Sequence, residues 1–193
     1  LRERKSDIAT INVQVETEWK AFKGFHGLLY SPSVDIAVGP FATARQYRAD
    51  YTKLINASKT LVNSLLTNFR SNYNNIFSNR ETTYDLPSLR NFTSNASNKN
   101  ARCLFAIEIE KSGSRKHRLG DIVNAAALGR MGILVAWDEK VLQSFFRIFK
   151  YFKFLSTAGK PTLAPHRRGV AKNVIILTKT QLETILARFV PSR

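Results

Sequence analysis

The sequence predicts an α/β fold with a mixed central sheet flanked by helices. Two short, continuous apolar runs, residues 132–137 and 173–177, are typical of strands that are covered on both faces. Helices are expected at residues 138–155 and 180–189, so strands and helices alternate along the second half of the chain. This alternation predicts helices packed on a sheet. With 193 residues, the chain is long enough for one domain, which we place at residues 1–193.

The first part of the chain is expected to add a helix and two strands. Apolar residues recur at three- and four-residue steps between residues 8 and 22, which predicts an amphipathic helix with Glu18 on or beside its apolar stripe. Short strands are expected at residues 27–30 and 34–38, separated by a Ser-Pro-Ser turn. The second of these strands contains Asp35.

The middle of the chain is expected to be an insertion at about residues 42–100. Residues 42–77 keep a helix-like period of apolar side chains. The stretch from residue 71 to residue 100 is rich in Asn and Ser and is predicted to be a loop or a partly ordered segment.

The charge of the chain indicates a polyanionic partner. It contains 30 Lys and Arg against 14 Asp and Glu, for a formal net charge of +16. Nucleic acid, in particular double-stranded DNA, is the expected partner, and the alternative is a basic protein whose charge serves only solubility. No apolar stretch reaches the roughly 20 residues of a membrane helix, so no membrane partner is expected. A homodimer is left open.

Cysteine and motif content exclude several classes of site. The single cysteine, Cys103, excludes an internal disulfide framework and a multi-cysteine zinc site, and indicates a reducing compartment such as the cytoplasm or the nucleoid. The sequence lacks the glycine-rich phosphate-binding and nucleophile-elbow motifs. The three histidines, His26, His117 and His166, have no ligand-like spacing.

Two glutamates stand one residue apart inside the apolar run at residues 104–111. Alternate residues of a strand share a face, so Glu108 and Glu110 are expected to point one way and Ile107 and Ile109 the other. Two neighbouring carboxylates on a half-buried strand repel each other unless a positive charge lies between them. A divalent cation with oxygen ligands is the usual partner of such a pair. The pattern therefore predicts a metal site.

The order of these elements resembles the core of the restriction-endonuclease-like, or PD-(D/E)xK, nuclease superfamily. In that family a helix, a small β-meander and a crossover helix hold the site. The helix with Glu18, the strand with Asp35, and the strand with Glu108 and Glu110 would correspond to it, over about residues 8–137. The resemblance implies a restriction-endonuclease-like core with a helical insertion.

The resemblance also implies an activity. It predicts a Mg²⁺-dependent endonuclease that hydrolyses DNA phosphodiester bonds, with Mn²⁺ as a possible substitute. Asp35, Glu108 and Glu110 would bind the metal ion, and Glu18 would join them from the first helix. Glu110 could also accept a proton from the attacking water.

One departure from the family concerns the residue that orients the water. The commonest third-strand motif of the family ends in lysine, where this chain has Glu110. Lys111 is a candidate catalytic residue, although it has the wrong strand parity unless a bulge turns it toward the site. Lys116, past the following turn, is the other nearby cation.

A helix is expected to begin near Asp121, after this turn. Relatives often place polar residues there, so Asp121 and Asn124 are predicted to support the site, with a helix cap and a surface amide as the alternatives. Basic residues in loops on either side are predicted to bind nucleic acid, with a solvated surface as the alternative. They are Arg115, Lys116, His117, Arg118, Arg167 and Arg168.

Two other functions remain open at the level of sequence. The first is a non-catalytic nucleic-acid-binding protein of the same fold. The second is a basic structural or assembly protein, because the helix at residues 138–155 is rich in aromatic side chains. Their helical spacing is typical of a core stripe, but a dimer interface or a membrane-surface helix is also compatible with it.

Overall fold

The computed structural model describes residues 11–22, 31–41, 48–77, 86–94, 97–157 and 170–189. The strands are β1 (Val15–Lys20), β2 (Ser33–Val38), β3 (Cys103–Glu110), β4 (Gly129–Ala136) and β5 (Val174–Thr178). The helices are α1 (Arg48–Ala57), α2 (Lys59–Phe77), α3 (Leu89–Thr93), α4 (Arg115–Leu128), α5 (Glu139–Thr157), the 3₁₀ helix η3 (Val170–Lys172) and α6 (Lys179–Ala187).

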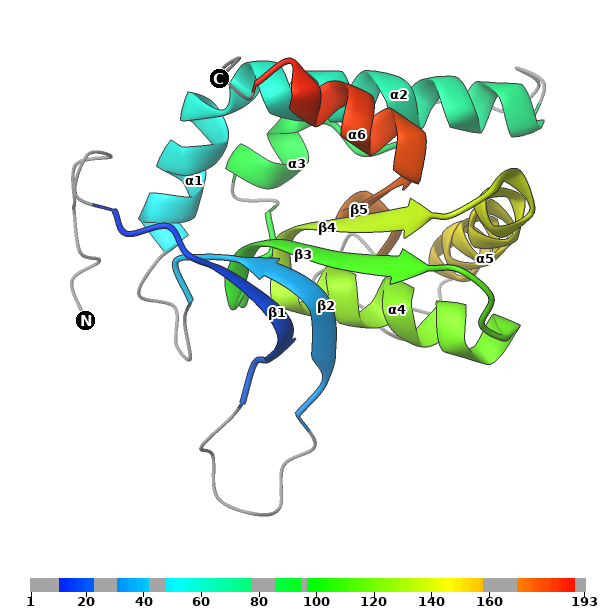
Figure 1. The fold of residues 1–193 in the computed structure, drawn as a ribbon, viewed down its shortest axis with the longest axis horizontal. Coiled ribbons are helices and arrows are strands. Elements are labelled where there is room, and N and C mark those ends of the chain that lie inside the picture. Colours follow the sequence, from blue (N-terminus) through cyan, green and yellow to red (C-terminus); the bar gives the residue numbers. More distant parts are fainter. Residues whose placement is uncertain are drawn as a thin grey trace.

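The described strands form one mixed sheet, as the sequence predicts. Their order is β1-β2-β3-β4-β5. Strand β2 is antiparallel to both of its neighbours, β1 and β3. Strand β4 is parallel to both of its neighbours, β3 and β5. Parallel neighbours need a crossover connection, which α4 provides between β3 and β4 and α5 provides between β4 and β5. In Figure 1 the antiparallel hairpin β1–β2 curls away from the three parallel strands.

Helices cover both faces of the sheet. Helix α4 packs against β3 and β4, and α2 packs against β5 and α6. Figure 1 shows α1, α2, α3 and α6 on one side of the sheet and α4 on the other. The predicted strand at residues 132–137 is β4, in which all eight residues are buried, as expected for a strand covered on both faces.

The close packing of α4 on the sheet depends on small residues. A Cβ atom at Gly132 would lie 2.7 Å from Cγ1 of Val174 and 2.9 Å from the backbone of Ala125. Ala125 and Ala126 on α4 are both buried. The alanine run at residues 125–127 therefore lets the helix approach the strand closely.

Replacing Gly132 with alanine is expected to destabilise the fold by about 1–3 kcal/mol, because the added methyl group meets backbone atoms that cannot move aside. Gly120 is a matched control, since a Cβ there would meet nothing within 4 Å. Gly120→Ala in helix α4 is expected to stabilise the protein by roughly 0.5–1 kcal/mol. Urea denaturation of the two variants measures both effects, and equal changes would contradict this account of the packing.

The described residues of the stretch 71–100 are more ordered than their composition predicts. Helix α2 continues to Phe77, and the short helix α3 follows within this stretch. Asn98 is buried, and its Nδ2 donates to the carbonyls of Ala126, Ala127 and Gly129 at the end of α4. Nδ2 of Asn173 also donates to the carbonyls of Ala126 and Gly129. The two asparagine side chains thus supply donors to carbonyls at the end of a helix, so polar residues here have a structural role.

A buried arginine joins the same region to the sheet. Arg130 on β4 donates from Nε to the Phe92 carbonyl (2.8 Å) and from Nη1 to the Asn98 carbonyl (3.1 Å). Its Nη2 donates to Oγ1 of Thr52 on α1 (2.5 Å). A buried charge requires such partners, and this one connects α1 and α3 to β4.

The prediction of an N-terminal helix is wrong over the described residues. Residues 15–20 form strand β1, which pairs with β2. Ile11, Val15 and Trp19 are spaced by four residues, and four is also a multiple of the strand period. The spacing therefore suits either element, and pairing with β2 decides between them. The strand predicted at residues 27–30 lies outside the described residues.

Two other expectations need adjustment. The helical stretch at residues 42–77 is two helices that meet at Ser58, and residues 42–47 lie outside the described part. Helix α4 begins at Arg115, earlier than expected, because Ser114 caps it: Oγ of Ser114 accepts from the backbone N–H of His117.

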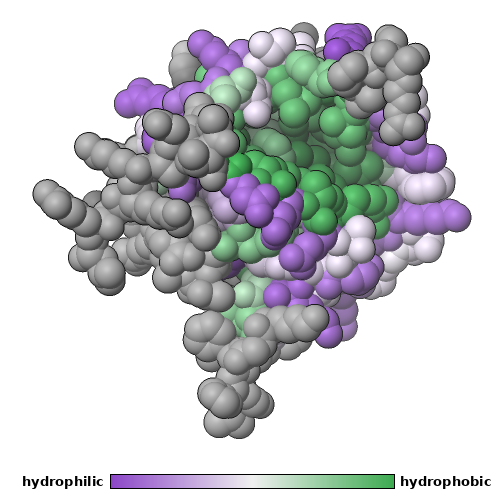
Figure 2. Space-filling view, turned by 60° about the vertical axis from the view of Figure 1, so that its left-hand side comes forward, coloured by the Kyte–Doolittle hydropathy of each residue, from purple (hydrophilic) through white to green (hydrophobic). Residues whose placement is uncertain are grey.

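The aromatic stripe of α5 belongs to the core. Phe145, Phe146, Phe149 and Phe152 are buried. Phe146 stacks on Phe69 of α2, and Phe149 contacts the same ring edge to face. Within the described residues, no helix has the length and apolar content that crossing a membrane requires. Figure 2 shows one face of the molecule, where hydrophobic residues gather in a continuous area bordered by hydrophilic ones.

Candidate functional site

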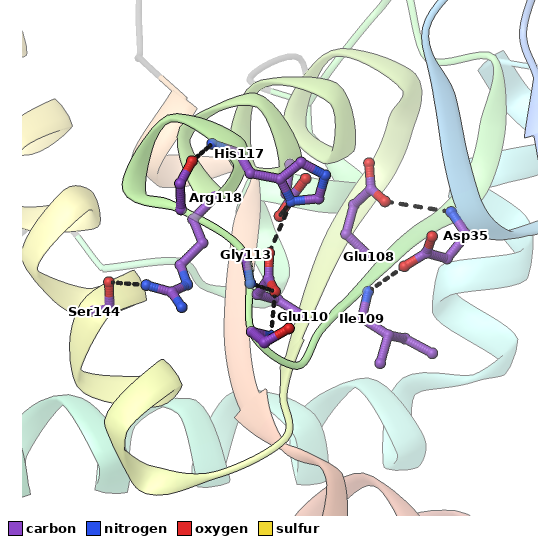
Figure 3. Close-up of polar contacts among 11 residues, drawn as sticks. Asp35, Glu108, Ile109, Glu110, Gly113, His117, Arg118 and Ser144 are labelled. Carbon is purple, nitrogen blue, oxygen red and sulfur yellow. Dashed lines mark hydrogen bonds and ion pairs between the residues drawn. The ribbon is translucent and has the colours of Figure 1, made fainter.

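Four carboxylates collect near the end of β3, beside β2 and the first turns of α4. We call this group the acidic cluster and define it as Asp35, Glu108, Glu110 and Asp121. Figure 3 labels Asp35, Glu108 and Glu110 together with His117, whose ring contacts the Glu110 carboxylate. The cluster contains the two glutamates that the sequence singles out and Asp35 from the neighbouring strand.

The two glutamates share one face of β3, but that face is the buried one. Glu108 is 6% exposed and Glu110 is 4% exposed, whereas Ile109 between them is 39% exposed. The expected parity is confirmed. The alternative of an exposed polar face is wrong for this pair, because the face that carries the glutamates is buried. Helix α4 covers this face of β3. The alternation of side chains along one strand does not tell which of its faces a helix will cover.

Asp35 and Glu108 meet where the β2–β3 ladder ends. The last backbone pair of the ladder at this end is Ile36 with Ile107, so Asp35 and Glu108 are the next opposing residues in this register. The backbone N–H of Asp35 donates to Oε2 of Glu108 (3.3 Å). The backbone N–H of Ile109 donates to Oδ2 of Asp35 (2.6 Å), as Figure 3 shows. Side chains therefore continue the pairing of the two strands and hold both carboxylates in place.

Glu110 is held by the turn that follows β3. Its Oε1 accepts from the backbone N–H groups of Ser112 (2.7 Å) and Gly113, and Oε2 lies 2.8 Å from Nδ1 of His117. Burial alone would raise the pKa of Glu110, but these three hydrogen bonds outweigh it and hold the pKa below its usual value. Glu110 is therefore ionised near neutral pH.

Gly113 is required for this arrangement. A Cβ atom at this position would collide with the Glu110 carboxylate and would lie 2.9 Å from Nδ1 of His117. Glycine thus lets the backbone of the turn approach the glutamate closely enough to donate to it.

His117 connects Glu110 to α4. Its Nδ1 also lies 3.5 Å from Oδ2 of Asp121, one helical turn later, and the side chain is 68% exposed. The hydrogen bond to Glu110, followed by the charge of Asp121, raises the pKa of His117. The imidazole is thus the exposed member of a set of three residues in which Glu110 and Asp121 are buried.

Replacing Glu110 with glutamine is expected to lower the pKa of His117 toward its ordinary value of 6.5, because the hydrogen bond to the carboxylate is the largest cause of the rise. The pH titration of the His117 ring protons by NMR measures this. Glu183→Gln on α6 is the charge-matched control and should leave the His117 pKa unchanged. An unchanged pKa in Glu110→Gln would contradict the contact.

Glu108 and Asp121 resist ionisation. Burial, followed by the charges of Asp121 and Asp35, raises the pKa of Glu108 to about 8, although a hydrogen bond from the Asn124 side chain opposes the rise. Burial also raises the pKa of Asp121 to about 6, against the favourable charge of His117. Asn124 thus contacts Glu108, and Asp121 is a buried member of the cluster rather than a helix cap.

Part of the group has the geometry of a metal site. Glu110, His117 and Asp121 each offer one ligand atom, and these atoms lie within 4.8 Å of one another. The sequence predicts the metal ion among Asp35, Glu108, Glu110 and Glu18, and His117 is not among these expected ligands. The available signal was the spacing of His117 and Asp121, four residues apart on a helix that directly follows the strand of Glu110.

Glu18 and Lys111 lie apart from the hydrogen bonds of this group. Glu18 is exposed on β1 with a φ of 48°, an uncommon backbone conformation for a residue with a side chain, and not on a first helix. Lys111 follows β3, and its ammonium lies 5.2 Å from the ring centre of Trp137. Lys179 lies 4.2 Å from the same ring.

The basic residues expected in a loop lie in the first turn of α4. Arg115, Lys116 and His117 are exposed there, and Arg118 donates from Nη1 to Oγ of Ser144 on α5 (2.8 Å; Figure 3). The second predicted basic stretch, with Arg167 and Arg168, falls outside the described residues.

Cys103 is not part of the site. It is fully buried at the start of β3, and burial raises the pKa of its thiol far above the usual range. Cys103 is therefore packed in the core as a small apolar residue.

Comparison of the chain with protein-family models, with curated proteins and with solved structures finds no match. The features of the chain that bear on function are therefore the geometry of the acidic cluster and the net charge of +16.

Proposed function

We propose that the protein is a metal-dependent endonuclease that hydrolyses phosphodiester bonds in DNA. One observation carries the proposal: four carboxylates and a histidine from β2, β3 and α4 collect at one place in a chain with a net charge of +16. The positive charge attracts a polyanion, whereas the acidic cluster repels it. A cation bound at the cluster removes this conflict.

The donor set suits a hard or borderline divalent ion. Glu110, Asp121 and His117 are the ligands that the geometry favours, and Asp35 and Glu108 add carboxylate oxygens beside them. Carboxylates are typical ligands of Mg²⁺ and Mn²⁺, and an imidazole in the set shifts the preference toward Mn²⁺. A bound ion would supply the positive charge that phosphodiester hydrolysis needs on its phosphoryl and leaving oxygens.

The residues of the chain have separate roles in this proposal. Glu110 is kept ionised and oriented by the N–H groups of Ser112 and Gly113, so it is a ready anionic ligand. Asn124 and the backbone of Asp35 donate to Glu108 and orient its carboxylate. Preorganised groups of this kind lose little freedom when a cation and a substrate bind.

The arrangement of strands supports a relation to restriction-endonuclease-like nucleases. An antiparallel meander, β1–β2–β3, is followed by the crossover helix α4 and by β4 parallel to β3. In this proposal Asp35 on the second strand of the meander, and Glu108 with Glu110 on the third, would correspond to the motif of this superfamily. Without a lysine at the place of Glu110, Lys116 on α4 and Lys111 remain the candidates to orient the water.

One observation favours a non-catalytic nucleic-acid-binding protein instead. Both carboxylate oxygens of Glu110 already have partners within the chain, namely Ser112, Gly113 and His117. A glutamate that is satisfied in this way needs no ion.

Incubation with supercoiled plasmid separates the two functions. A nuclease converts the plasmid to nicked or linear forms with Mg²⁺ or Mn²⁺ and leaves it intact with EDTA. A binding protein retards the plasmid in a gel under all three conditions without cutting it. Calorimetric titration with Mn²⁺ measures the proposed site directly, and no detectable binding would exclude the metal-dependent mechanism.

A further inference from the structure

A groove lies between α4 and α5. It is a cavity of about 350 Å³. Helix α4 contributes Arg115, Lys116 and Leu119, and α5 contributes Ser144, Arg147, Ile148 and Tyr151. We call this feature the α4–α5 groove. Its volume is within the range of small-ligand sites.

The groove carries positive charge without counter-charge. None of its lining residues is acidic, and within the described part of the chain Arg115, Lys116 and Arg147 make no ion pair. Arg118 lies beside the groove and donates a hydrogen bond from Nη1 to Oγ of the lining residue Ser144. The Nε atom of Arg118 is buried without a hydrogen-bond partner. Cations gathered in this way repel one another, and a bound anion relieves the repulsion.

The rest of the lining is apolar and partly aromatic. Leu119 and Ile148 lie on facing helices, and Tyr151 is 51% exposed. An exposed aromatic ring beside cations is the combination by which proteins bind single-stranded nucleic acid, since the ring stacks on a base and the cations contact the phosphates. A base within a duplex is already stacked on its neighbours and would not reach such a ring.

We propose that the α4–α5 groove binds one nucleotide unit of a single-stranded nucleic acid, with its phosphates at Arg115, Lys116 and Arg147 and its base against Tyr151. Arg115 and Lys116 share the first turn of α4 with His117, a member of the proposed metal site. Binding in the groove requires no metal ion and does not depend on the proposed function.

Fluorescence anisotropy with a labelled single strand of about ten thymidine nucleotides, in EDTA to prevent cleavage, tests the proposal. Arg147→Ala is expected to weaken binding about tenfold and to reduce the salt dependence by about 0.7 in its logarithmic slope. Tyr151→Ala is expected to weaken binding about five- to tenfold with the slope unchanged, and Tyr151→Phe should retain binding.

Two other residues of α5 provide matched controls. Lys140 is an exposed cation and Phe154 is an exposed aromatic residue, and neither lines the groove. Lys140→Ala and Phe154→Ala should each change affinity by less than about twofold. Equal losses in the Arg147 and Lys140 variants would show a general effect of charge and overturn the proposal.

Further outcomes separate the groove from the nuclease activity. A loss in Tyr151→Ala that is equally large for polyphosphate, which has no bases, would overturn the stacking contact. Normal strand binding by both groove variants, together with metal-dependent cleavage by the wild type, would overturn the groove alone. Weakened strand binding with no cleavage under any metal condition would support the groove and overturn the nuclease.

Discussion

Asp121→Asn is expected to lower the rate of metal-dependent plasmid cleavage by at least about 100-fold, because a ligand carboxylate contributes several kcal/mol through the ion it holds. The same variant should lose Mn²⁺ binding in a calorimetric titration. Its fold should not suffer, since burial raises the pKa of Asp121 and an uncharged amide of the same shape avoids that cost. Loss of activity with retained stability would then locate the effect in the site.

Glu16→Gln is the charge-matched control for this experiment. Glu16 is exposed on β1, and its replacement changes the net charge by the same amount. Plasmid binding measured in EDTA should be equal in the two variants and at least as strong as in the wild type, because removing an acidic charge favours a polyanion. Full cleavage activity in Asp121→Asn would remove this residue from the proposed site.

The second large effect concerns stability as a function of pH. In the folded protein the pKa of Glu108 rises from 4.5 to about 8, with burial as the first cause and the charges of Asp121 and Asp35 next. Between these two pH values the folded state keeps a proton that the unfolded state has lost. The free energy of unfolding therefore falls as the pH rises through this window, by on the order of 4 kcal/mol from this residue.

Glu108→Gln is expected to remove this loss of stability. In metal-free buffer at pH 8 or above, the variant should be more stable than the wild type by a few kcal/mol, and near pH 4.5 the two should be nearly equal. Urea denaturation at several pH values measures the difference, in which contributions from all other groups common to both proteins cancel. The control Glu16→Gln should follow the wild-type profile. Parallel profiles for wild type and Glu108→Gln would contradict the buried carboxylate.

The parallel part of the sheet was predictable from local sequence. The apolar runs that became β4 and β5 are continuous and are bounded by helical segments, so no other element suited them. The predicted strand around Glu108 is β3, with the expected parity of its glutamates. Continuous apolar runs of this kind predict buried strands well because burial of apolar surface is the dominant favourable term in the free energy of folding.

The beginning of the chain was not predictable in the same way. Apolar residues four apart fit a helix and a strand equally well, and Glu18 was therefore placed on a helix that β1 replaces. The start of α4 was also missed, because the basic residues 115–118 look like a loop until Ser114 is known to cap them. Both errors concern weak local signals that a neighbouring strand or a single hydrogen bond decides.

For the candidate site, sequence found the carboxylates but not their grouping. Asp35 and Glu108 were expected to approach each other, and they do so across the end of the β2–β3 ladder. The spacing of His117 from the other histidines along the chain gives no sign of a ligand role. Its partners are carboxylates, one on a strand and one on its own helix.

By itself, the sequence determined the α/β class, the buried strands and the excess of positive charge, because these follow from composition and from short-range periodicity. Only the tertiary structure decided which face of β3 is buried, and hence that Glu108 and Glu110 lie beneath α4. It also decided that His117 joins Glu110 to Asp121, and that α4 and α5 enclose a basic groove. The physical reason is that distances between side chains on different elements depend on how helices pack on the sheet, which no local pattern encodes.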